Sequence, residues 1–267
     1  MIKIIYFHDI FRENATYLST QTGWKLFNGF QDKSWLELHD ILIVFGIHES
    51  SKIFLQCIQN IPFSIVLIQS ENINSAYFTT TYRELLQHPR VYVFNYSLCN
   101  QELLHTKYNI QSHLFSWNFF SSSPFLKKTF DIAFIGASSR ERRTLIQSIQ
   151  RKRPDLRYYI NYQYNLGYEK LTKIYQNTKY VLNISIYRKA LETHRILKAL
   201  SCGANVISTY SIESKDNDKY QEYIYFTDDF LSTVKNIETL PPKKKYSEFV
   251  KEYQDEFTSI QYFAEQL

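Results

Sequence analysis

Short apolar runs alternate with segments of helical periodicity along most of this chain, and this alternation constrains the fold more than any other feature. In the first half the pattern predicts strands at Ile2–Phe7, Trp24–Phe27, Ile41–Phe45, Ser64–Ile68, Val91–Phe94 and Ser112–Ser116, and helices at Glu49–Gln59, Ser75–Leu86 and Leu98–Lys107. Strands that are separated by helices need crossover connections, which leave neighbouring strands parallel. The first half is therefore predicted to form a parallel α/β domain.

A second series of the same kind begins after Ser121–Lys128, a segment whose serine run and proline predict a linker. The predicted strands are Phe130–Ile135, Arg157–Ile160, Lys179–Ile184, Asn205–Ser208 and Tyr223–Phe226, with helices near Glu141–Arg151 and at Glu192–Ser201. We therefore expect an α/β protein with two Rossmann-like domains that face a cleft, at residues 1–125 and 126–267.

The tail after Pro241 and Pro242 carries apolar side chains at close to i, i+3, i+4, i+7 spacing, from Tyr246 to Ala264. This spacing predicts an amphipathic helix over about residues 243–267. Such a helix either covers an exposed sheet face or crosses from the second domain back onto the first.

Composition excludes several classes of protein. The chain has only six glycines and no G-x-G, so a glycine-rich dinucleotide fingerprint is excluded. A net charge of +5 is too small for a dedicated nucleic-acid binder, and we expect no nucleic-acid partner. The three cysteines lie far apart, which predicts neither a metal site nor a disulfide framework and favours a reducing compartment. No apolar run is long enough to span a bilayer, so we expect a cytoplasmic protein, in the host cytoplasm if the chain is viral.

Ligands of open parallel sheets bind beyond the carboxyl ends of the strands, so the residues that follow each strand are the first candidates. In the second domain the strand at 130–135 runs into Gly136, and a helix starts near Ser138 or Ser139. Arg142 and Arg143 lie in the first turn of that helix. Free backbone N–H groups and cations together suit a phosphate, whereas the alternative is an ordinary capped helix with solvated arginines.

A second polar segment follows the strand that ends near Asn183. A loop carries Tyr187, and Glu192, His194 and Arg195 then open a helix. Arg195 and the helix N-terminus could hold a diphosphate, while Glu192 could accept hydrogen bonds from sugar hydroxyls. The helix is predicted to stop at Gly203 in a left-handed conformation.

Four stretches of the chain, in order, resemble glycosyltransferases of the GT-B type, in particular a viral and bacterial branch similar to glycosyl transferase group 1. They are IVLIQSENINSAYF, YRELLQHPRVYVFNYSLCNQELL, FDIAFIGASSRERR and LETHRILKALSCGANVIS, which together span roughly residues 64–210. The resemblance implies a nucleotide-sugar donor on the second domain and a glycan or glycoconjugate acceptor on the first. It implies transfer of the sugar to a hydroxyl group. Arg143, Arg195 and the helix dipoles would stabilise the charge of the leaving group, so we expect no metal or other cofactor; the oligomeric state stays open.

Inverting transfer needs a general base near the acceptor hydroxyl. His8 and Asp9 follow the first strand, His48 and Glu49 follow the third, and Glu71 follows the fourth. Asp9 and Glu71 are the candidates for this base. Both positions also suit helix N-caps, which is the structural alternative.

The chain departs from the family pattern in one respect. Many GT-B enzymes carry two glutamates eight positions apart, and here Ala190 and Lys198 occupy those positions. Whether configuration is retained or inverted therefore stays open. Two other functions also stay open: a nucleotide-sugar epimerase of the same fold, and a glycan-binding module without catalysis.

Two further patterns have ordinary explanations. Asp216, Asn217 and Asp218 spell a D-x-D, but they lie in a predicted polar loop, so we expect no metal site there. The basic runs Arg151–Arg153 and Lys243–Lys245 could touch anionic lipid at a membrane surface, although solvated helix ends explain runs this short.

Overall fold

The computed structural model describes residues 1–29, 40–60, 63–122, 127–163, 166–185 and 191–267. The chain divides into two compact units. The first unit contains residues 1–120 together with 253–267, and the second unit contains residues 121–252. Each unit is built around one sheet in which every pair of neighbouring strands is parallel, which confirms the predicted α/β class.

The sheet of the first unit has the strand order β2-β1-β3-β4-β5-β6. Its strands are β1 (Ile2–Tyr6), β2 (Lys25–Asn28), β3 (Ile41–Phe45), β4 (Ser64–Gln69), β5 (Val91–Asn95) and β6 (Ser112–Leu114). Its helices are η1 (Asp9–Phe11), α1 (Arg12–Thr22), η2 (His48–Ser50), α2 (Ser51–Asn60), α3 (Thr80–Leu86), α4 (Leu98–Tyr108) and α11 (Gln254–Gln266). The central strands are almost continuously apolar because helices cover both faces of the sheet.

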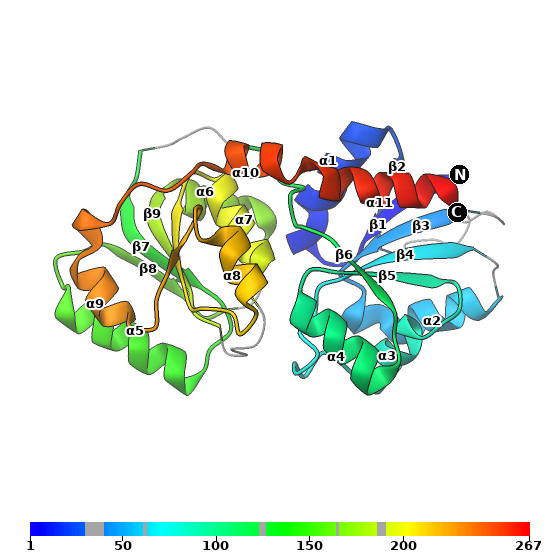
Figure 1. Cartoon of the computed structure of the whole chain (residues 1–267), viewed down its shortest axis with the longest axis horizontal. Helices are drawn as coiled ribbons and strands as arrows, with labels where there is room; N and C mark the ends of the chain where they lie inside the picture. Colours follow the sequence, from blue (N-terminus) through cyan, green and yellow to red (C-terminus); the bar gives the residue numbers. More distant parts are fainter. Residues whose placement is uncertain (30–39, 61–62, 123–126, 164–165, 186–190) are drawn as a thin grey trace. The chain divides into compact units, whose positions relative to one another are not determined.

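One face of this sheet packs against α2, α3 and α4, through buried side chains such as Leu67, Val93 and Leu104. The C-terminal helix α11 packs on the opposite face. The ring of its Phe263 packs against the rings of Tyr92 and Phe94, with 5.3 Å between the ring centres in each pair. Figure 1 shows α11 beside the strands of the first unit, although it is the last element of the chain. Asn118 also donates a hydrogen bond to the carbonyl of Tyr253, at 2.8 Å, where this segment enters the unit.

The sheet of the second unit has the order β11-β10-β9-β7-β8. Its strands are β7 (Phe130–Ile135), β8 (Tyr158–Asn161), β9 (Thr178–Asn183), β10 (Asn205–Ser208) and β11 (Tyr225–Phe226). Its helices are α5 (Arg140–Lys152), α6 (Tyr168–Gln176), α7 (Thr193–Ser201), α8 (Ser214–Tyr220), α9 (Phe230–Lys235), η3 (Ile237–Thr239) and α10 (Tyr246–Glu252). Helices α5 and α9 pack on one face, around Ile132, Phe134 and Ile146. Helices α6 and α7 contact β9 and β10 from the other face.

The structure differs from the sequence expectations mainly in the polar helices. Helices α1, α6, α8 and α9 are present although no helix was predicted there, and the residues of α1 and α8 are too polar to show an apolar stripe. Helix α3 begins at Thr80 rather than Ser75, because the Thr79 hydroxyl accepts a hydrogen bond from the Tyr82 N–H and caps it. The tail forms two helices, α10 and α11, in place of one continuous helix.

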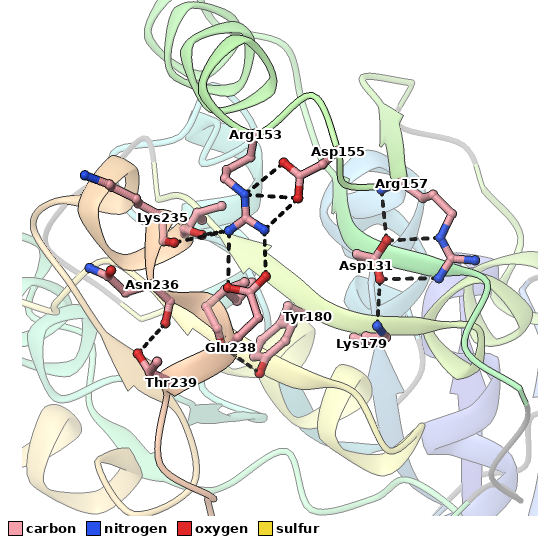
Figure 2. A network of polar contacts seen from close by, with 12 residues as sticks. Asp131, Arg153, Asp155, Arg157, Lys179, Tyr180, Lys235, Asn236, Glu238 and Thr239 are labelled. Carbon is pink, nitrogen blue, oxygen red and sulfur yellow. Dashed lines mark hydrogen bonds and ion pairs between the residues drawn. The ribbon is translucent and has the colours of Figure 1, made fainter.

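Charged side chains are concentrated at the amino ends of the strands of the second unit (Figure 2). Asp131 of β7 accepts hydrogen bonds from the Arg157 backbone N–H at 2.9 Å and from Arg157 Nε at 3.0 Å, and it lies 2.8 Å from Lys179 Nζ. The hydrogen bonds from Arg157 and the charge of Lys179 lower the pKa of Asp131 well below its usual range. Asp131 therefore joins the starts of three neighbouring strands through one carboxylate.

Arg153 occupies a second cluster of this kind, bonded to Asp155 at 2.8 Å, Glu238 at 2.6 Å and the Val234 carbonyl at 2.9 Å (Figure 2). One of the three cations of the basic run 151–153, Arg153, is therefore held in ion pairs within the second unit. Lys244 of the other basic run likewise pairs with Glu222 and Glu252. In the described part of the chain, no helix is both long enough and apolar enough to cross a membrane.

Asp131→Asn is expected to lower the free energy of unfolding at pH 7 by about 1–2 kcal/mol, a modest value because Arg157 and Lys179 are half exposed and water screens the pairs. A carboxylate with a depressed native pKa stabilises the fold above its unfolded pKa, and this stabilisation is lost as pH falls. Urea unfolding of both proteins should therefore show a difference that shrinks below about pH 4. A difference that stays constant down to pH 2 would contradict the pairing.

Phe263→Ala is expected to destabilise the first unit by about 1–3 kcal/mol, since it removes the contacts of α11 with Tyr92, Phe94 and His113. Tyr262→Ala is the matched control, because Tyr262 is 64% exposed on the same helix. Thermal unfolding followed by near-ultraviolet circular dichroism compares the two variants. Equal effects would show that α11 is not held by this aromatic contact.

Candidate functional site

The sheet of the second unit contains a topological switch point between β7 and β9. From β7 the chain goes first to β8 on one side and then to β9 on the other. The connections on the two sides of β7 therefore lie on opposite faces, and the carboxyl ends of β7 and β9 are the place where ligands of open α/β sheets bind. Gly136 follows β7 and Asn183 ends β9, so two predicted site residues lie at this point.

Gly136 allows an arginine to approach the backbone closely. A Cβ atom at this position would lie 3.1 Å from Arg195 Nη2 and 3.3 Å from the ring of Phe134. Both contacts are tighter than ordinary van der Waals contact, so a Cβ atom here would require the neighbouring groups to shift by a few tenths of an ångström. The absence of a side chain, rather than a special backbone angle, is what this glycine supplies.

Arg142 is buried and holds the connections of the site together. Its Nε donates to the Ile184 carbonyl at 2.8 Å, and its Nη1 donates to the Ala137 carbonyl at 2.9 Å. Its Nη2 also donates to the Ile184 carbonyl. The same Nη2 donates to Glu192 Oε1 at 3.1 Å. The guanidinium also lies over the Phe134 ring, 5.4 Å from its centre. One side chain thus joins the loops after β7 and β9 to the start of α7.

Glu192 lies between two arginines. Its Oε1 pairs with Arg142, and its Oε2 lies 2.6 Å from Arg195 Nη1. Arg195 also donates from Nη1 to Asn183 Oδ1 at 2.9 Å, which fixes it above the end of β9. Arg195 is 18% exposed, whereas Arg142 is 3% exposed. Of the two cations, Arg195 is therefore the one placed to meet a ligand.

The carboxyl end of β10 completes the second-unit cluster. Asn183 Nδ2 donates to the Ser208 hydroxyl at 3.0 Å, and this hydroxyl donates to the Thr209 carbonyl at 2.9 Å. Asn183 and Ser208 are register partners, which places both side chains on the same face of the sheet. Ser208 was not among the predicted site residues, although its position at a strand end was readable from the pattern.

The other predicted residues of the second unit lie around this cluster. Helix α5 begins where the sequence predicted, near Ser138 and Ser139, and Ser139 is its N-cap, accepting from the Arg142 N–H at 3.2 Å. Ser138 and Arg143 are exposed on the same helix start. Burial, together with the charges of Lys198 and Arg195, lowers the pKa of His194 to about 3, so this imidazole is neutral. Tyr187 lies outside the described residues.

The helix N-termini differ in what they leave open to an anion. In α5 the Ser139 hydroxyl already caps the first turn. In α7 the N-cap residue is Glu192, and its side chain makes no capping hydrogen bond because both its oxygens face arginines. The partial positive charge of the α7 N-terminus and the Arg195 guanidinium therefore lie together, an arrangement suited to a diphosphate.

In the first unit, the two carboxylates predicted as bases differ in environment. Asp9 is exposed in η1, and the cap of this turn is the His8 side chain, which accepts from the Ile10 N–H, rather than Asp9. Glu71 is 9% exposed: its Oε2 accepts from the Ser75 hydroxyl at 3.1 Å, and its Oε1 lies 3.3 Å from His48 Nδ1. Glu71 does not cap α3, because Thr79 does.

The D-x-D sequence lies in a helix rather than in the polar loop that was predicted for it. Asp216 and Asp218 belong to α8, and Asp216 is buried while Asp218 is exposed. Desolvation raises the pKa of Asp216 to about 6. Among the described residues, no group of three or more His, Cys, Asp or Glu side chains has a geometry that could hold a metal ion.

Comparison with known proteins shows likeness in structure alone. No protein-family model matches the chain, and no curated protein matches it in sequence. The chain is similar to the crystal structure of AviGT4, a glycosyltransferase involved in avilamycin A biosynthesis, with a TM-score of 0.58 and 9% identity over 100% of this chain and 96% of that one. It is also similar to a sucrose-phosphate synthase from Thermosynechococcus elongatus, with a TM-score of 0.52 and 11% identity over 85% of this chain and 73% of that one.

Identities this low show a shared fold and nothing finer. The chain has a fold like that of these two proteins, with two parallel-sheet α/β units. This confirms the coarse implication of the sequence resemblance. The viral and bacterial branch stays a prediction.

Arg142→Met is expected to lower the stability of the second unit by about 2–4 kcal/mol, since it leaves two buried carbonyls and Glu192 without their donor. Arg143→Met is the matched control at the next residue of α5. Because the Arg143 side chain is exposed, this substitution should change the free energy of unfolding by less than about 0.5 kcal/mol. Chemical unfolding measures both. Equal stability of the two variants would contradict the structural role of Arg142.

Proposed function

We propose that the chain is a glycosyltransferase that moves a sugar from a nucleotide-diphosphate-sugar donor to a hydroxyl of a glycan or glycoconjugate. The observation that carries the proposal is the cluster at the switch point of the second unit. There the lack of a side chain at Gly136 lets Arg195 approach the backbone, beside the start of α7. A nucleotide-binding fold with cations and a helix N-terminus at this position suits an anionic leaving group. The glycosyltransferase-like fold supports the same reaction class.

The roles of the second-unit residues follow from their contacts. Arg195 and the N–H groups at the start of α7 would bind the diphosphate and stabilise the negative charge that grows as the sugar–phosphate bond breaks. Asn183 and Glu192 would hold the Arg195 guanidinium in place through their hydrogen bonds. Arg142 would act indirectly, as the side chain that positions Glu192.

Arg143 and Ser138 are exposed at the start of α5, at the same edge of the sheet, and would contact the outer part of the donor. With two arginines and a helix dipole to balance the charge, we propose that transfer needs no metal ion and no cofactor. The acceptor would bind to the first unit, at the carboxyl ends of its own strands.

Arg195→Met is expected to weaken donor binding at least tenfold without unfolding the protein, because the guanidinium is the partly exposed cation of the cluster. Calorimetric titration with UDP-, GDP- and TDP-sugars measures the affinity, and a CMP-sugar, which has a single phosphate, should bind least. Gly136→Ala should act in the same direction with a smaller effect, since its methyl group would lie 3.1 Å from Arg195 Nη2 and shift it by a few tenths of an ångström.

Arg151→Met is the matched control, because Arg151 is exposed at the far end of α5. If Arg195→Met binds the preferred donor as tightly as the wild type, the assigned diphosphate site is wrong. Incubation of the wild type with donor alone tests the reaction class. Epimerisation of the sugar in the absence of any acceptor would replace the transferase proposal with an epimerase.

A further inference from the structure

Strands β8, β7 and β9 are neighbours in the sheet of the second unit, so their amino ends lie side by side. Three segments lead into these strands, at residues 127–131, 151–158 and 173–180. A fourth segment, at residues 234–239, contains the end of α9 and accepts a hydrogen bond from Arg153 of the second segment. We call these four segments the amino-edge surface, and the structure describes all of their residues.

Hydrogen bonds between the segments hold the amino-edge surface together. Arg153 Nη1 donates to the Lys235 carbonyl at 3.2 Å, which joins the end of α5 to the end of α9 (Figure 2). The Thr129 N–H donates to the Asn177 carbonyl at 2.8 Å. Asn177 Nδ2 in turn donates to the Lys173 carbonyl at 2.7 Å. The backbone positions of the charged residues on this surface are therefore fixed within the unit.

The net positive charge of the protein is concentrated on the amino-edge surface. Its four segments contain nine lysines and arginines but only three carboxylates, which is a formal excess of +6. The whole chain has a formal net charge of +5, so all the other residues together carry −1. Charges that lie in short, separate runs of the sequence are thus gathered by the fold onto one edge of the second unit.

The three carboxylates of the surface are already paired within it. Asp155 and Glu238 pair with Arg153, at 2.8 Å and 2.6 Å. Asp131 lies 3.0 Å from Arg157 Nε and also pairs with a lysine of the next strand. No carboxylate of these four described segments is left to balance the remaining cations, so their charge is balanced from outside the surface.

Four lysines of the surface are exposed and form no ion pair within the part of the chain that the structure describes. They are Lys127, Lys152, Lys173 and Lys235. Figure 2 shows the ammonium end of Lys235 directed away from Glu238. Like charges on one edge repel one another, and an anionic partner would remove this repulsion.

We propose that the amino-edge surface binds an anionic lipid bilayer. Lysine ammonium groups are compact, strongly hydrated point charges, which suits attraction to a layer of acidic headgroups. Each lysine near such a bilayer raises the partition coefficient of a protein by about fivefold. None of the large apolar side chains in the four described segments is exposed, so the contact is electrostatic and inserts nothing into the hydrocarbon core.

A nucleic acid is another polyanion that a basic surface attracts, but the side chains present favour the bilayer. Nucleic-acid sites use arginines on phosphates and bases, or exposed aromatic rings that stack on bases. Here carboxylates hold Arg153 and Arg157. Arg151 donates to the Gln147 carbonyl and the Ser148 hydroxyl of its own helix. The available cations are therefore lysines, and no aromatic ring of these described segments is exposed.

The amino-edge surface and the candidate donor site lie at opposite edges of one sheet. Strand β7 has six residues, which separates its two ends by about 20 Å. A bilayer bound at the amino ends therefore leaves Gly136 and Arg195, beyond the carboxyl ends, open to a ligand. The inference does not depend on the proposed function, since either can hold without the other.

Cosedimentation of the full chain with lipid vesicles tests the proposal. The wild type is expected to bind vesicles that contain phosphatidylserine at about 0.1 M salt and to leave them at about 1 M salt, where the Debye length is only about 3 Å. Vesicles of phosphatidylcholine alone should not bind it. The triple variant Lys152→Gln, Lys173→Gln, Lys235→Gln should lower the partition coefficient about 100-fold. Its thermal unfolding should match that of the wild type, because all three side chains are exposed.

The matched control is the triple variant Lys52→Gln, Lys170→Gln, Lys215→Gln, which loses the same charge from exposed positions on α2, α6 and α8. It should bind the anionic vesicles within about fivefold of the wild type. An equal loss of binding in both triple variants would overturn the proposal, and so would a wild type that does not bind the anionic vesicles. Tighter binding to a DNA duplex than to the vesicles would assign the surface to nucleic acid instead.

Calorimetric titration with nucleotide-sugar donors keeps this test separate from that of the proposed function. Donor affinity should be equal in the wild type and in the amino-edge triple variant, because the changed lysines lie at the other edge of the sheet. A protein that binds the anionic vesicles but no donor would contradict the proposed function alone. A protein that binds a donor but not the vesicles would contradict this inference alone.

Discussion

The second unit depends on the buried guanidinium of Arg142. A buried cation is costly unless its donors are all directed at acceptors, and here they reach the Ile184 and Ala137 carbonyls and Glu192. These acceptors belong to the loops after two different strands and to the start of a helix. The interaction therefore fixes the relative position of the segments from which the candidate donor site is made. Arg195 then meets a Glu192 that is already held in place.

The two units share one architecture but carry different side chains at the corresponding edge of the sheet. Each has a parallel sheet with a switch point next to its first strand, and polar side chains gather at the carboxyl ends of the strands there. In the second unit these side chains are arginines paired with one glutamate, which suits an anion. In the first unit they include an imidazole and a carboxylate, since His48 Nδ1 lies 3.3 Å from Glu71 Oε1.

The sequence predicted the parallel strands well, because buried strands and their spacing are local signals. It also predicted a helix start near Ser138 or Ser139 and the left-handed Gly203. The helix α8 was missed because a polar helix carries no apolar stripe, and its D-x-D was therefore placed in a loop. The internal role of Arg142 could not be predicted, since its partners Ala137, Ile184 and Glu192 come together only in the folded sheet. The His48–Glu71 pair was missed for the same reason: each residue follows a different strand.

The central claim is that a nucleoside diphosphate binds where β7, β9 and α7 meet. A crystal structure of the full chain soaked with the preferred nucleoside diphosphate tests it most directly. The account predicts that the diphosphate oxygens lie within hydrogen-bond distance of the Arg195 guanidinium, beside Gly136 and the first turn of α7. A diphosphate bound at another place on the second unit, with Arg195 still paired only to Glu192 and Asn183, would contradict the account.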